Sequence, residues 1–67
     1  MKDLKEVCQL AVETVSREGG QGSRRQIVRK MIYLLGADGD SKLAEEGIDE
    51  AISDGYLSQA GDILALV

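Results

Sequence analysis

Four basic residues in one short stretch are the strongest candidate for a binding site in this sequence. They are Arg24, Arg25, Arg29 and Lys30. Ser23 precedes them, and Ser23 with Gln26 has the capping-box spacing that begins a helix. The free N–H groups of a helix start and the guanidinium forks beside them suit a phosphate or a carboxylate. Three interpretations follow: a solvated basic face, a contact for an acidic protein partner, or a contact for nucleic-acid phosphates.

Acidic residues dominate the stretch that comes next. Between Asp38 and Asp54 there are seven acidic residues and a single basic one, Lys42. The carboxylates expected on the outer face of a helix here belong to Glu45, Glu46, Asp49 and Glu50. Such a face usually serves solubility, but it also suits docking to a basic partner or imitation of a row of phosphates. The net charge of −4 argues against a protein that relies on overall attraction to DNA.

Catalytic and metal-binding chemistry has few candidate residues. The chain has no histidine, and its single cysteine, Cys8, falls on the apolar stripe of the first expected helix, where it should behave as a small hydrophobe. Residues 19–23 are rich in glycine but match no phosphate-binding loop pattern. Residues 38–43 begin like a calcium loop, yet a lysine and a leucine replace the required ligand and glycine. We therefore expect no enzyme, no cofactor and no metal site.

Apolar spacing predicts three helices. Apolar residues recur at helical intervals over residues 3–17, 24–35 and 41–54. Glycines follow each stretch and are placed to end the helices, while Asp40 or Ser41 is placed to cap the third. The expected buried face of the second helix consists of Ile27, Val28, Met31, Ile32, Leu34 and Leu35.

The chain is expected to close with a β-hairpin. Residues 56–59 and 63–67 are apolar-rich runs joined by a short link that contains glycine. A two-stranded hairpin is marginal by itself, so this one must pack on the helices. Residues 19–22 are expected to form a loop. The predicted fold class is mainly α with a small β-hairpin (α+β), a three-helix bundle with a C-terminal two-stranded hairpin, in one domain over residues 1–67.

This order of elements resembles the winged-helix (winged helix-turn-helix) domain family. The likeness is closest over residues 48–57, Ile-Asp-Glu-Ala-Ile-Ser-Asp-Gly-Tyr-Leu, because the recognition helix of that family commonly ends in a Gly-aromatic-Leu step into the wing. The resemblance covers almost the whole chain. It implies that the third helix holds the place of the DNA-reading helix and that residues 58–62 form the wing tip. Here, however, that helix carries carboxylates and the wing carries no basic residue, and carboxylates repel phosphates.

The sequence also bears on cellular setting. One cysteine cannot form an internal disulfide, the first residues carry charges without an apolar signal region, and no stretch approaches the length of a membrane span. We expect a cytoplasmic protein without a membrane contact.

Three functions remain open at this point. The first is a small interaction module or regulator that acts through protein contacts, using the basic residues of the second helix and the acidic face of the third. The alternative is a DNA-binding transcription regulator in which the second helix and the glycine-rich loop contact phosphates, in the form of a homodimer that doubles the basic surface. The third is a structural or oligomerisation module, because the final strand, residues 63–67, is apolar on both faces and needs cover.

Overall fold

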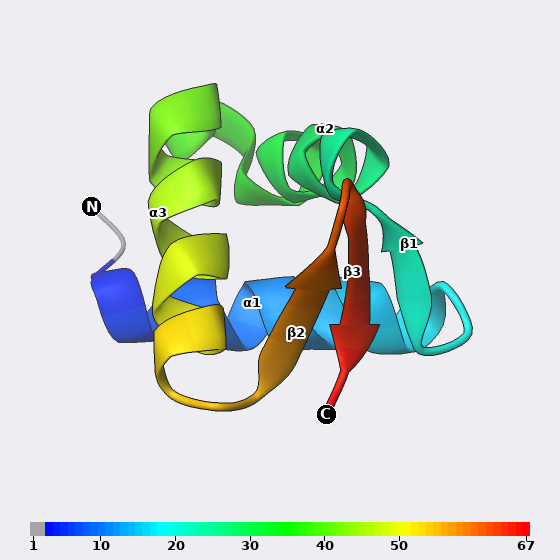
Figure 1. Ribbon diagram of the computed structural model, residues 1–67. Coiled ribbons are helices and arrows are strands. Elements are labelled where there is room, and N and C mark those ends of the chain that lie inside the picture. The colour runs from blue at the N-terminus through cyan, green and yellow to red at the C-terminus, as the bar shows by residue number, and fades with distance from the viewer. Residues whose placement is uncertain (1–2) are drawn as a thin grey trace.

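A computed structural model describes residues 3–67, apart from the side chain of Asp38, and these residues form three helices and a small antiparallel sheet. In chain order the elements are α1 (Leu4–Arg17), β1 (Gln21–Ser23), α2 (Arg24–Leu35), the 3-10 turn η1 (Gly36–Asp38), α3 (Ser41–Ser53), β2 (Leu57–Ala60) and β3 (Ile63–Leu66). Figure 1 shows α2 and α3 above and to the left of the sheet, with α1 running behind it. The predicted fold class, mainly α with a small β component, is confirmed.

Each of the three helices begins at a side chain that caps its first turn, and for α2 and α3 that residue is one the sequence predicts. Asp3 accepts a hydrogen bond from the backbone N–H of Glu6, and Ser23 accepts one from Gln26 at 3.2 Å. Of the two residues considered for α3, Asp40 is the cap, since its carboxylate accepts from the N–H of Leu43 at 2.7 Å. Each of these bonds satisfies one of the donors that the first turn of a helix leaves unpaired.

The sheet has one more strand than the hairpin predicted from sequence. Its strand order is β1-β3-β2, with both pairs antiparallel. The expected loop over residues 19–22 is therefore wrong in its second half, because Gln21–Ser23 pairs with β3 in the register Gln21↔Ala65 and Ser23↔Ile63. Glycine and polar residues carry little strand propensity, so what makes β1 a strand is the free edge of β3 beside it.

β3 is the central strand of the sheet and has no free edge for a strand from a second copy of the chain. Both edges of this apolar strand are hydrogen-bonded inside the molecule. Two further backbone bonds hold the neighbouring turns, from the N–H of Leu66 to the carbonyl of Gly20 and from the N–H of Arg24 to the carbonyl of Asp62. β1 therefore occupies the edge of β3 that a strand from a second copy would pair with, while Ile63 and Leu66 on this strand are each still 40% exposed.

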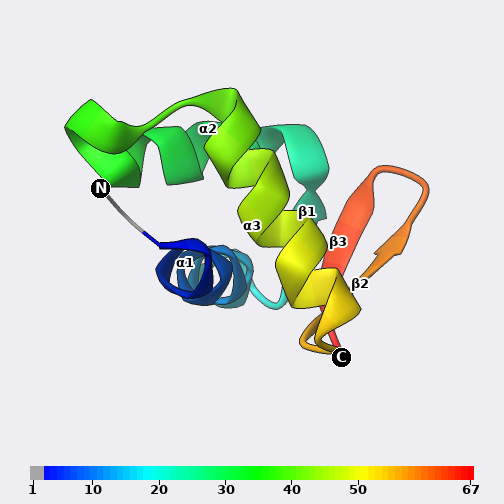
Figure 2. The same cartoon turned by 90° about the vertical axis from the view of Figure 1, so that its left-hand side faces the viewer.

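The core lies where α1, α2 and α3 meet the inner face of the sheet. It consists of Val7, Cys8, Ala11, Val15, Ile27, Val28, Met31, Leu35, Ala44, Ile48, Ala51, Leu57 and Leu64. Gly47 is also buried, and it lets α3 approach the backbone of Val7 on α1. Figure 2, which looks almost along α1, shows α3 close to α1 and the link between β2 and β3 projecting away from the helices.

One apolar residue expected inside lies at the surface. The helical spacing predicts a buried Leu34 on α2, but 46% of its surface is exposed. It lies at the margin of the apolar stripe, and helical spacing alone does not separate a margin from a centre. Among residues 3–67, no helix has the length and apolar content needed to cross a membrane.

Candidate functional site

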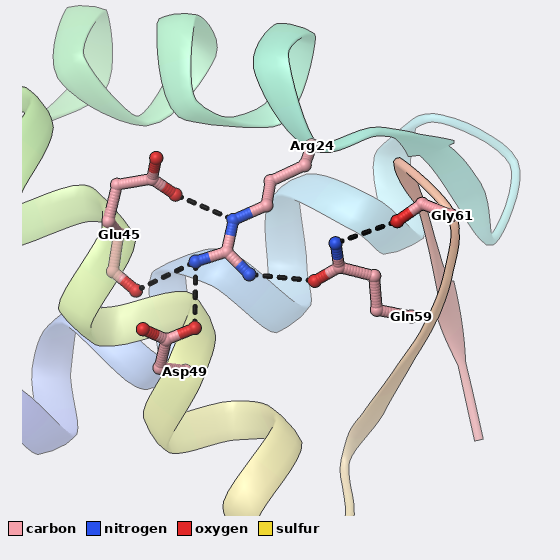
Figure 3. A network of polar contacts seen from close by, with 5 residues as sticks. All are labelled: Arg24, Glu45, Asp49, Gln59 and Gly61. Atoms are coloured by element: carbon pink, nitrogen blue, oxygen red, sulfur yellow. Dashed lines mark hydrogen bonds and ion pairs between the residues drawn. The ribbon is translucent and has the colours of Figure 1, made fainter.

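Arg24 does not lie on a solvated basic face. It is the first residue of α2, and its side chain turns toward α3 and β2, where only 21% of it is exposed. Figure 3 shows the guanidinium reaching across the space between these elements. Its Nε donates to Oε1 of Glu45 at 2.6 Å, and its Nη2 donates to Oδ1 of Asp49 at 2.7 Å. Arg24 is therefore an internal bridge rather than a free cation.

The same guanidinium also holds the hairpin. Nη1 of Arg24 donates to Oε1 of Gln59 on β2 at 2.7 Å, and the amide of Gln59 donates in turn to the carbonyl of Gly61 at 2.9 Å (Figure 3). We call Arg24, Glu45, Asp49 and Gln59 the Arg24 network. It connects the start of α2, the outer face of α3 and the strand that leads into the wing tip.

Electrostatics keeps Arg24 charged in this position. Partial burial by itself would lower the pKa of its guanidinium, but the hydrogen bonds from it to Asp49 and Glu45 outweigh that effect and raise the pKa. A charged arginine with two carboxylate partners on one side and an amide oxygen on the other has nearly all its donors occupied. Little donor capacity is left for a phosphate from outside.

The other three basic residues separate from Arg24 and from one another. Lys30 forms an ion pair with Glu18, the residue that follows α1. Arg25 and Arg29 are exposed, and neither makes an ion pair with a side chain in residues 3–67. The stretch that looked like one basic cluster in the sequence therefore provides one internal bridge, one surface ion pair and two free guanidinium groups.

The acidic face of α3 divides in a similar way. Glu45 and Asp49 bind Arg24, while Glu46 is exposed and Glu50 is partly exposed on the same helix. Lys42 is exposed at the start of α3. The surface formed by α3 and the β2–β3 hairpin, which we call the α3–hairpin face, thus presents carboxylates to water, and its arginine is already paired.

The metal-binding residue types and the single cysteine are a further set of candidate site residues. Among the side chains that the structure describes, no group of three or more His, Cys, Asp or Glu is placed to hold a metal ion. Cys8 is buried in the core, and burial raises the pKa of its thiol, with the charges of Asp54 and Glu50 adding to the shift. A thiol of this kind stays protonated and unreactive at neutral pH.

A groove between α1 and α2 is the feature that sequence reasoning missed. It has a volume of about 390 Å³ and is lined by Thr14, Arg17, Glu18, Arg29, Lys30, Tyr33 and Leu34. Tyr33 is 84% exposed beside it. Arg29 belongs to the basic stretch that the sequence singles out, and Tyr33 lies four residues further along α2, on the same side of that helix. That the end of α1 would lie opposite them could not be inferred from either stretch alone.

Comparisons of the chain with protein-family models, with curated proteins and with solved structures found no match.

Proposed function

We propose that this chain is a small non-catalytic interaction module or regulator of the winged-helix type, which acts in the cytoplasm through contacts with protein. The order of three helices and two closing strands, with β1 as a third strand beside β3, supports the winged-helix relationship. The proposal that the partner is a protein and not DNA is supported by the chemistry of the surface with which a winged helix would contact DNA.

The Arg24 network carries this proposal. On the α3–hairpin face, Arg24 is committed to Glu45 and Asp49 at 2.6 and 2.7 Å. Neighbouring Glu46 adds a carboxylate without a basic partner among residues 3–67. Bringing this surface within a Debye length of a phosphate backbone would set carboxylates against phosphates. It would also release few counterions, and counterion release supplies most of the affinity of non-specific DNA binding.

A DNA-binding regulator is the second candidate, and one observation favours it. Arg25 and Arg29 project from α2 without ion-pair partners in the described part of the chain. Two such groups in a monomer, or four in a homodimer, could contact phosphates from the side of α2. The number of contacts stays small against a chain of net charge −4.

The experiment that tests the proposal is affinity capture with a nuclease arm. The tagged chain is incubated with extract of the cells that produce it, half of which has been treated with nuclease, and tag alone serves as the control. We expect a discrete protein to be retained in comparable amounts from both halves, with no enrichment of nucleic acid. Retention of nucleic acid, or of proteins that disappear after nuclease treatment, would favour the DNA-binding alternative.

A further inference from the structure

We propose that the groove between α1 and α2 binds an acidic peptide segment that carries an apolar side chain. This inference rests on the proposed function and names the partner chemistry and the site of contact. None of the lining residues belongs to α3 or to the hairpin, so the groove is separate from the Arg24 network. A module built this way would meet its partner on the α1–α2 side.

The groove has the apolar lining that a side chain needs. Tyr33 is 84% and Leu34 46% exposed, and both lie along it. Thr14 is buried, and its hydroxyl donates to the carbonyl of Leu10 at 2.7 Å within α1, so its polar hydrogen is not offered to a ligand. Tyrosine and arginine are among the residue types that contribute most to binding energy when a protein partner covers them. An apolar side chain seated between Tyr33 and Leu34 would exclude water from both.

The basic side chains around the groove favour acidic residues on either side of the apolar side chain of the peptide. Three basic side chains line it, and Lys30 is already paired with Glu18. Arg17 and Arg29 make no ion pair with any side chain in residues 3–67. Guanidinium groups bind carboxylates in a bidentate fashion, so two or more Asp or Glu residues around the apolar anchor complete the match.

The groove offers a charge contribution from its arginines and an apolar contribution from its lining, and together they favour a peptide over a nucleic acid. Two uncompensated arginines neutralise few phosphates, and the affinity that comes from counterion release grows with the number neutralised. The apolar lining at Leu34 contributes nothing to a phosphate backbone. A peptide with carboxylates and a buried apolar side chain uses both parts of the groove, and it stays clear of the carboxylates of α3.

A displayed library of random peptides of about twelve residues provides the probe, because a groove of this size holds a short segment. The library is selected on the immobilised full chain, and the consensus peptide is then synthesised with a fluorophore. We expect a consensus with two or more Asp or Glu residues around a Leu, Ile, Phe or Tyr. In anisotropy titrations, Arg29→Glu and Tyr33→Ala should each weaken its binding by about tenfold or more. The exposed Gln26→Ala variant, outside the groove, should bind like the wild type.

Several results would overturn the assignment. One is a peptide consensus without acidic residues. Another is peptide binding that Arg29→Glu and Tyr33→Ala leave unchanged in folded protein. The third is tighter binding of a single-stranded oligonucleotide of equal length at the same salt concentration. Self-association that Arg29→Glu abolishes would assign the groove to a second copy instead. Circular dichroism melts confirm that each variant is folded.

The capture experiment separates this inference from the proposed function. A protein partner retained equally by the wild type, Arg29→Glu and Tyr33→Ala would refute the groove and leave the interaction module standing. Capture of nucleic acid alone would refute both.

Discussion

Replacing Gly47 by alanine is expected to destabilise the protein by about 2 kcal/mol, although the same change on an exposed helix face would stabilise by up to about 1 kcal/mol. Gly47 is buried in the middle of α3, and a Cβ there would overlap Cγ1 of Val7 and lie 3.0 Å from the carbonyl carbon and oxygen of that residue. Val7 is itself completely buried, so it has no open space to move into. The added methyl must push α1 and α3 apart.

Urea unfolding followed by circular dichroism measures this effect. Glu46→Ala is the matched control, since Glu46 is the exposed neighbour on α3 and its substitution should change the free energy of unfolding by less than about 0.5 kcal/mol. In the double variant with Val7→Ala, the loss should be smaller than the sum of the two single losses, because the clash with Cγ1 has gone. A Gly47→Ala protein as stable as the wild type would show that α1 and α3 are not packed this closely.

Replacing Arg24 by alanine is expected to destabilise the protein by about 1–2 kcal/mol. Arg24 joins three elements through four hydrogen-bond contacts, of which two are to carboxylates. The side chains of Glu45 and Asp49 are 48% and 67% exposed, so water replaces part of what they lose, and this keeps the cost below that of a buried charge pair. For a domain of this size the change corresponds to a fall in Tm of about 4–8 °C per kcal/mol.

The neighbouring arginine supplies the control. Arg25 is exposed and makes no ion pair in residues 3–67, so Arg25→Ala should melt within about 2 °C of the wild type. Arg24→Lys should fall between the wild type and Arg24→Ala, since lysine keeps the charge but loses the fork that binds several acceptors at once. Equal melting temperatures for Arg24→Ala and Arg25→Ala would mean that the Arg24 network contributes nothing to the fold.

The helices could be predicted from the sequence because their signals are local. Asp3, Ser23 and Asp40 each satisfy an N–H three residues away, and apolar residues at helical spacing mark the buried faces. Gly36 and Gly55 have positive φ at the helix ends, a conformation that glycine adopts without steric cost.

Features that depend on distant parts of the chain could not be predicted in the same way. β1 becomes a strand only because β3 offers it an edge, and Gly47 has a role only because Val7 lies against it. Arg24 looked like a member of a basic cluster because its partner Asp49 is 25 residues further along the chain. The candidate site in the structure therefore differs most from the one predicted from the sequence. The basic and acidic stretches, which the sequence presents as two separate surfaces, meet in one network.

Anisotropy titration of the wild-type chain against a fluorescent random duplex DNA, at about 20 mM salt, tests most directly the claim that the α3–hairpin face is closed to phosphate. We predict a dissociation constant weaker than about 100 µM, with little dependence on added salt. Micromolar binding that weakens steeply as salt is added, and that is lost when Gln59 and Lys42 on the α3–hairpin face are replaced by glutamate, would contradict it.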